Sequence, residues 1–284
     1  MLNKKIALGT ALWGWKIERK SCLQLLDFFY ETHGRYIDTA SNYPINGVLS
    51  QRYLAEDILS EWIRVNNCPD LKVIYKIGSI ENQNISNNNL SSGYLDEEIN
   101  RFLEKSQLKT IIPMIHWDDS ANKEDIQNVV QFLVDQPFDS IGFSGIKNIS
   151  LYRNVISTNN FKLPVYFEAK SNIIDSNVTD YFGFNNSRIF AYGIGATGLK
   201  LINSYSNDSS FRIVKGQDKH EKYLTKDVRT RISRIQAQNK NLMDVYDIGI
   251  ALAENNERLY GYIIAPRTLG QLKKTLDTIF RIRN

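Results

Sequence analysis

Short apolar runs alternate with longer amphipathic segments along the whole chain. Each short run has five to eight residues with near-continuous apolar character, which is typical of strands buried on both faces of a parallel sheet. In the longer segments apolar residues recur at helical spacing, as for Leu25, Leu26 and Phe29. The pattern predicts eight strands, at 5–10, 36–40, 71–78, 110–116, 140–145, 163–169, 187–193 and 259–265.

A helix is predicted after every one of these strands. The predicted helices are 18–34, 48–66, 93–107, 123–136, 148–158, 174–184, 225–238, 242–255 and 269–282. A polar, loop-like stretch at 203–222 precedes the helix at 225–238. Eight strand–helix units in 284 residues match the size and rhythm of a closed (β/α)8 TIM barrel, with a doubly wound open sheet as the alternative. No linker rich in Pro or Gly divides the chain, so 1–284 is predicted to be a single α/β domain.

Composition limits where in the cell the protein is expected and which classes of partner it is expected to bind. The N-terminus lacks the apolar core of a secretory signal, and no apolar run approaches the roughly 18 residues that a membrane span needs. Two cysteines, Cys22 and Cys68, provide no disulfide framework, so a cytoplasmic protein without membrane contacts is predicted. The net charge of +4 suits an anionic small ligand. The basic segment 215–240 carries no aromatic platform, so no nucleic-acid partner is expected, and the oligomeric state is left open.

In such a barrel, functional residues lie at the carboxyl ends of the strands. Taken alone, each residue at these ends has an ordinary structural explanation, such as a helix cap for Asp38 or a core position for His116. Together they predict one site at the barrel mouth. The residues are Trp13, Asp38, Lys76, His116, Ser144, Glu168, Tyr192 and Arg267.

A G-x-G-x-x-G pattern follows the seventh predicted strand, at Gly193, Gly195 and Gly198. A Rossmann fingerprint would continue into a crossover helix, whereas the polar stretch 203–222 follows here. As a signal for the fold, the pattern is therefore accidental.

Seven segments, in order, resemble the aldo-keto reductase superfamily: "LGTALWGW", "YIDTASNY", "IYKIG", "IHWDD", "IGFSG", "RIFAYGIGATGL" and "IIAPRTLGQLKKTL". The resemblance implies an NADP-dependent oxidoreductase, with NAD possible, that interconverts a carbonyl (aldehyde, ketone or sugar) and an alcohol by hydride transfer. It assigns Tyr43 as general acid/base, Lys76 and Asp38 as the groups that tune it, and His116 as the group that orients the substrate oxygen. A free tyrosine has a pKa of about 10, and the Lys76 ammonium is expected to lower that of Tyr43.

The resemblance also implies a cofactor-binding set, with Tyr192 stacked on the nicotinamide, Ser144 at the carboxamide and Arg267 at the 2′-phosphate. The full set is Ser144, Glu168, Tyr192, Gly193, Gly195, Gly198, Arg267 and Gln271. The sequence departs from the family pattern at four places: Gly145 and Thr275 replace Asn, Glu168 replaces Gln, and Ala265-Pro266 replaces Pro-Gly. A carboxylate at Glu168 would favour the positively charged oxidised nicotinamide and, on this hypothesis, alcohol or sugar oxidation.

Three tryptophans are predicted at the substrate entrance: Trp13, Trp15 and Trp117, with packing as the alternative for Trp15. The segment 203–222 is either a lid over the cofactor or a surface loop. No metal is predicted. Two other functions stay open: a cofactor-sensing barrel, like the potassium-channel beta subunits of this family, and a non-redox or redox-neutral lyase or isomerase.

Overall fold

The computed structural model describes residues 3–81, 84–159, 162–206, 209–216 and 219–284. Its centre is a closed barrel of parallel strands in sequence order, in which β1 pairs with both β2 and β8. All eight predicted strands are confirmed, and the open-sheet alternative is wrong. The strands are β1 (Lys5–Gly9), β2 (Tyr36–Ala40), β3 (Lys72–Ile77), β4 (Ile112–Asp118), β5 (Ile141–Ile146), β6 (Val165–Lys170), β7 (Ser187–Tyr192) and β8 (Gly261–Ile264).

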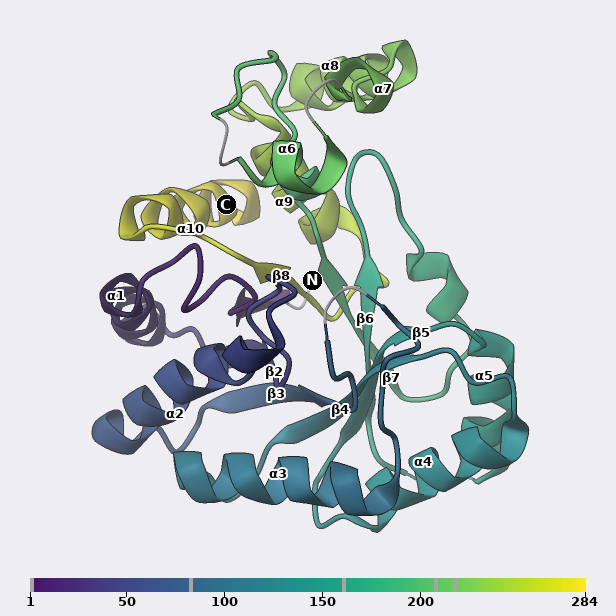
Figure 1. Cartoon of the computed structure of the whole chain (residues 1–284). Coiled ribbons are helices and arrows are strands. Elements are labelled where there is room, and N and C mark those ends of the chain that lie inside the picture. The colour runs from purple at the N-terminus through teal and green to yellow at the C-terminus, as the bar shows by residue number, and fades with distance from the viewer. Residues whose placement is uncertain (1–2, 82–83, 160–161, 207–208, 217–218) are drawn as a thin grey trace.

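Most of the helices surround this barrel (Figure 1). The α-helices of the described residues are α1 (Arg19–Glu31), α2 (Leu54–Asn66), α3 (Ser92–Ser106), α4 (Lys123–Asp135), α5 (Ile149–Thr158), α6 (Ser210–Lys215), α7 (His220–Tyr223), α8 (Lys226–Gln238), α9 (Val245–Asn255) and α10 (Leu269–Arg283). None of the described helices is both long and apolar enough to cross a membrane.

The α-helix predicted at 174–184 is wrong. Only a 3₁₀ turn, η2 (Val178–Tyr181), forms there. Asp, Ser and Asn open this segment and favour turns, and Gly183 closes it with φ +89°, outside helical space. The buried Val178 and Tyr181 side chains pack into the main core without a longer helix.

The interior of the barrel has an apolar floor with polar residues above it. Because side chains alternate along a strand, the residue two positions beyond an inward-facing floor residue also points inward, nearer the carboxyl end. The floor contains Tyr36, Ile74, Met114, Tyr166 and Phe190. Two positions further on, the chain places Asp38, Lys76, His116, Glu168 and Tyr192.

Strand register brings these polar residues together. His116 on β4 is level with Ser144 on β5, and Ser144 is level with Glu168 on β6. Lys76 on β3 is level with Met114, one interior layer below His116. Three neighbouring strands therefore present polar side chains at one level, with the Lys76 ammonium reaching up toward them.

The stretch predicted to be a polar loop contains helices and a small core of its own. Tyr205 stacks on Phe211, with ring centroids 4.8 Å apart, and both pack with Leu224 and Ile248 in a second hydrophobic cluster. Helices α6, α7 and α8 stand beyond α9, outside the ring of helices around the barrel (Figure 1). Positions 207–208 and 217–218 of the 203–222 segment lie outside the described residues.

Candidate active site

Lys76 lies between two buried carboxylates at the barrel mouth. Its ammonium donates to Asp38 Oδ1 and to both oxygens of Glu168, at 3.2 Å (Oε1) and 3.1 Å (Oε2). All three side chains are at most 5% exposed. Burial tends to lower the pKa of Lys76, but the charges of Asp38 and Glu168 prevail and raise it well above its usual value. Lys76 is therefore a permanent cation in this site.

Tyr43 and His116 face each other above this cluster. Tyr43 lies in the loop after β2, with its ring edge-on to His116 and the two ring centroids 6.0 Å apart. Lys76 Nζ lies 5.2 Å from the centroid of the Tyr43 ring. The structure thus brings together Asp38, Tyr43, Lys76 and His116, which the sequence assigned to one site.

The pKa of Tyr43 differs from the expectation. Burial raises it above the usual value for tyrosine; Lys76 acts to lower it, whereas Asp38 and Glu168 act to raise it further. The lowering expected from Lys76 is present, but burial outweighs it. In this state of the protein Tyr43 is a protonated phenol, with a proton to donate.

His116 is neutral. Burial, and then the nearby Lys76 charge, hold its pKa well below the usual value. Its Nδ1 is buried and has no hydrogen-bond partner among the residues that the structure describes. A neutral imidazole with an unpaired nitrogen at the mouth is suited to a hydrogen bond with a bound polar group.

Glu168 has a second contact, with Ser144, whose hydroxyl donates to Glu168 Oε2 at 3.0 Å. The sequence placed both residues at a cofactor carboxamide and did not foresee that Glu168 pairs with Lys76. Tyr192, at the end of β7, is 38% exposed and presents its side chain at the mouth.

The loop after β7 has an unusual backbone. Gly193, Ala196, Thr197 and Gly198 all have positive φ, between +48° and +81°. Gly195 instead makes room for packing, because a Cβ there would lie 2.6 Å from the Tyr246 ring. Of the three glycines in the accidental fingerprint, two meet a conformational need and one meets a packing need.

Arg267 follows β8 and is half-buried. No ion pair of its guanidinium is recorded within the described parts of the chain. Its backbone N–H donates to Gln271 Oε1 at 2.7 Å, so the Gln271 side chain shapes the turn into α10. Lys274 is already paired with Asp244 at 2.8 Å. Arg267 is thus a cation at this edge of the mouth that is available to an anionic ligand.

A family model described as "Aldo/keto reductase family" matches residues 5–282. The chain belongs to the aldo/keto reductase family. It is an oxidoreductase, of a family that interconverts carbonyl and alcohol groups.

Two further comparisons agree with the family and the fold. A Saccharomyces cerevisiae protein named as an aryl-alcohol dehydrogenase, AAD6, is 29% identical over 156 residues, which cover 51% of this chain and 69% of that protein. The structure of the glycerol dehydrogenase AKR11B4 from Gluconobacter oxydans superposes with a TM-score of 0.70 at 16% identity, covering 97% of this chain and 86% of the other. The structural likeness supports the barrel architecture.

In this aldo/keto reductase Gly145, which stands where the family pattern has an asparagine, lies against a tryptophan. Gly145 has φ +70°, and a Cβ there would lie 2.4 Å from Trp117 Cδ1. The Trp117 ring also lies beside His116, with centroids 5.1 Å apart. Gly145 and Trp117 therefore form a matched pair at the mouth, in which the indole occupies the space that a larger residue 145 would need.

We expect Gly145→Ala to destabilise the fold by about 2 to 4 kcal/mol, because it combines a left-handed backbone with a steric clash. Gly198→Ala is the matched control, since Gly198 also has positive φ (+81°) but has nothing within 4 Å of its Cβ position. Urea unfolding should show a clearly larger loss for Gly145→Ala, and Trp117→Ala in the same chain should recover part of it. Equal losses for the two glycine variants would refute the pairing.

The other two tryptophans lie differently. Trp13 is fully buried in the main core, so it presents no face to an open pocket. Trp15 is 38% exposed, with Lys16 Nζ 4.9 Å from its ring centroid. Contact of either residue with a substrate stays a prediction.

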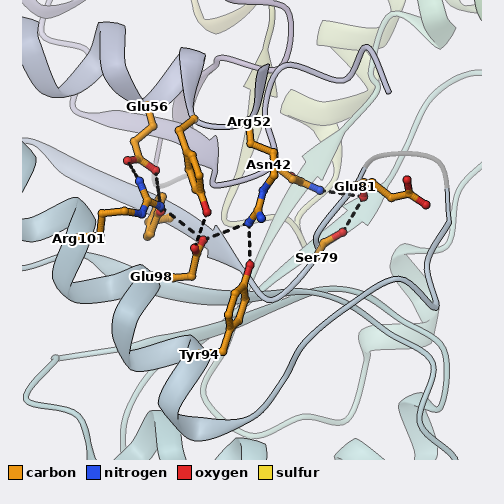
Figure 2. Close-up of polar contacts among 10 residues, drawn as sticks. Asn42, Arg52, Glu56, Ser79, Glu81, Tyr94, Glu98 and Arg101 are labelled. Carbon is orange, nitrogen blue, oxygen red and sulfur yellow. Dashed lines mark hydrogen bonds and ion pairs between the residues drawn. The ribbon is translucent and has the colours of Figure 1, made fainter. Parts of the chain in front are cut away.

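Hydrogen bonds hold the start of the loop that carries Tyr43 (Figure 2). Asn42 donates to the backbone oxygen of Glu81 at 3.1 Å, and Ser79 donates to the same oxygen at 2.8 Å. Because residues 79–81 follow β3, these bonds join the Tyr43 loop to the strand that carries Lys76.

Side chains of α3 hold the end of the same loop. Tyr53 donates to Glu98 Oε1 at 2.7 Å, and the Arg101 guanidinium lies 3.6 Å from the Tyr53 ring centroid. Arg52 donates to the Tyr94 hydroxyl at 2.7 Å, as Figure 2 shows. Sequence analysis missed this network. The signal that could have revealed it was a polar residue, Glu98, on the otherwise apolar face of a helix. The network fixes both ends of the loop and with them the position of Tyr43.

Proposed function

We propose that this protein is an NADP-dependent aldo/keto reductase that interconverts a small carbonyl compound and the corresponding alcohol, with Tyr43 as general acid/base. The observation that carries the proposal is the juxtaposition of Tyr43, Lys76 and His116 at the carboxyl end of the barrel. Family membership supports the reaction class.

The residues at the mouth fit a nicotinamide dinucleotide. Ser144 and Glu168 present a hydroxyl and a carboxylate that suit a carboxamide, and Tyr192 presents a partly exposed ring. His116 retains an unpaired buried nitrogen. These are the donors, acceptors and stacking surface that such a ligand needs, and the bound cofactor would supply the hydride.

The chain's own residues would handle the oxygen and the proton. His116, being neutral, would hydrogen-bond the carbonyl oxygen and direct it toward Tyr43. The Tyr43 hydroxyl would donate its proton to that oxygen as the adjacent carbon accepts the hydride. Lys76, a permanent cation, would stabilise the phenolate left behind, and Asp38 would hold Lys76 in position.

The function is tested by following NADPH absorbance with a panel of small aldehydes, ketones and sugars. We expect NADPH consumption only when a carbonyl compound is present, with one alcohol formed per NADPH consumed. Consumption that does not depend on any carbonyl compound, or turnover without a change in the cofactor, would contradict it.

The preference for NADP over NAD is assigned to Arg267. A guanidinium binds a phosphate through paired charge-assisted hydrogen bonds. We therefore expect Arg267→Gln to weaken NADPH binding by about 10- to 100-fold and to leave NADH binding unchanged.

Lys273→Gln is the control for this experiment, since Lys273 lies on α10, the helix that follows Arg267, with its Nζ over the Phe28 ring, 5.1 Å from the centroid. Titration followed by tryptophan fluorescence measures the affinity of each of the two variants for NADPH and for NADH. If Arg267→Gln weakened the binding of NADPH and of NADH equally, Arg267 would not be the residue that binds the 2′-phosphate.

A further inference from the structure

The barrel mouth holds one ammonium for two carboxylates. Lys76 contacts both Asp38 and Glu168, and no other cation is recorded against either carboxylate within the described residues. Both carboxylates are at most 5% exposed, so solvent screens their charge poorly. When both are ionised, the cluster carries an excess negative charge.

The neighbouring groups do not cancel this charge. Around the cluster stand His116 from β4, Ser144 from β5, Tyr192 from β7 and Tyr43 from the loop after β2. His116 is neutral, because its pKa is lowered. Tyr43 and Tyr192 have raised pKa values, in both cases chiefly by burial, and are neutral phenols.

Asp38 is subject to this excess charge. Burial first, and then the charge of Glu168, raise its pKa well above the usual value in spite of Lys76. A cation bound nearby would relieve this repulsion. The oxidised nicotinamide ring carries a positive charge, whereas the reduced ring is neutral.

We propose that Glu168, by placing a second carboxylate on Lys76, makes this site bind NADP⁺ more tightly than NADPH. The inference rests on the proposed function, because it needs the nicotinamide to lie beside Ser144 and Glu168. A glutamine at this position would keep the size and one accepting oxygen and would remove the charge.

The preference has a consequence for the direction of the reaction. Tighter binding of the oxidised form lowers the midpoint potential of the bound couple, which makes bound NADPH the stronger hydride donor. The substrate carbon accepts the hydride, its oxygen accepts the Tyr43 proton, and an alcohol and NADP⁺ result. The Glu168 charge therefore favours carbonyl reduction in the chemical step and slow release of NADP⁺ afterwards. This is the reverse of the alcohol oxidation expected from the sequence.

The test compares the dissociation constants of NADP⁺ and NADPH by fluorescence titration and calorimetry. It uses the unmodified protein, Glu168→Gln, Glu168→Asp and a control, Glu254→Gln. Glu254 resembles Glu168 in being a carboxylate with little exposure that forms an ion pair, in this case with Arg283 at 2.7 Å. Arg283 also donates to the backbone oxygen of Lys4, just before β1. The control therefore removes a similar charge at the opposite end of the barrel.

We expect the unmodified protein to bind NADP⁺ more tightly than NADPH. Glu168→Gln should shift the ratio of the two constants toward NADPH by roughly tenfold or more, given the low screening in the site. A tenfold shift corresponds to about 30 mV in the potential of the bound couple. Glu168→Asp should keep the preference because it keeps the charge, and Glu254→Gln should not change it.

An unchanged ratio in Glu168→Gln, with both forms still bound, would overturn the inference and leave the proposed function intact. Equal binding of the two forms, or tighter binding of NADPH, by the unmodified protein would also overturn it, and this result does not depend on the folding of any variant. Failure of the unmodified protein to bind either form would overturn the proposed function and the inference with it.

Discussion

Replacing Tyr43 with phenylalanine should lower kcat for carbonyl reduction by about 10²- to 10⁴-fold, the usual contribution of a general acid. The substitution removes only the hydroxyl, and the ring retains its edge-on contact with His116. Cofactor affinity should stay within about twofold, because Tyr43 acts on the substrate oxygen rather than on the cofactor. Steady-state kinetics together with a binding titration measures both effects.

Tyr152→Phe is the control for Tyr43→Phe. Tyr152 is another buried tyrosine, whose hydroxyl donates to Asp118 at 2.6 Å behind the barrel wall. Loss of that bond should lower stability by about 1 kcal/mol without a change in kcat. Similar kcat values for the two variants would mean that Tyr43 is not the proton donor.

Replacing Lys76 with methionine should destabilise the protein by about 3 to 5 kcal/mol, because it leaves two buried carboxylates without their cation. The loss should grow as the pH rises above about 4, where the carboxylates ionise in the unfolded chain. The sign follows from linkage: burial and the Glu168 charge already raise the pKa of Asp38, and without the ammonium its folded-state pKa lies still further above the unfolded value. The native variant then binds more protons than the unfolded chain, and stability falls with rising pH.

Lys105→Met is the matched control for Lys76→Met. Lys105 pairs with Asp57 on the surface, where both side chains are more than 40% exposed. Its loss should change stability by at most about 1 kcal/mol, with little dependence on pH. Urea unfolding at pH 5 and pH 8 compares the two variants. Equal effects would show that Lys76 does not compensate buried charge.

The barrel could be predicted because the same pattern of apolar and polar residues recurs at strand after strand. Each strand is a short apolar run, and each polar residue at its carboxyl end follows an inward-facing residue at a spacing of two. The segment 174–184 was misread because Val178 and Tyr181 have the i, i+3 spacing of a helix face. Turn-forming residues around them limit the helix to a single 3₁₀ turn.

The stretch 203–222 was misread for the opposite reason. Its apolar residues are few, Tyr205 and the short run Phe211, Ile213 and Val214, so no periodic face is visible in the sequence. Folding brings Tyr205 onto Phe211, and His220 donates through Nε2 to the backbone oxygen of Lys200, 2.9 Å away. Such contacts stabilise short helices that local propensity alone does not favour.

At the site, residue types and strand order could be predicted, but pairings could not. Sequence position places Lys76 and Glu168 at the same mouth, yet 92 residues separate them and only the closed barrel brings them into contact. The raised pKa of Tyr43 depends on how fully the folded chain buries it, which a motif does not report. The packing of Trp117 on Gly145 likewise needs the positive φ of both residues.

The measurement that tests the account most directly is a titration of the purified, unmodified protein with NADPH, NADP⁺, NADH and NAD⁺. Quenching of tryptophan fluorescence reports binding, because Trp117 lies at the mouth beside His116. The account predicts saturable binding of one cofactor per chain, with the phosphorylated forms bound more tightly than the others. Absence of binding by all four forms would contradict a nicotinamide site at the barrel mouth.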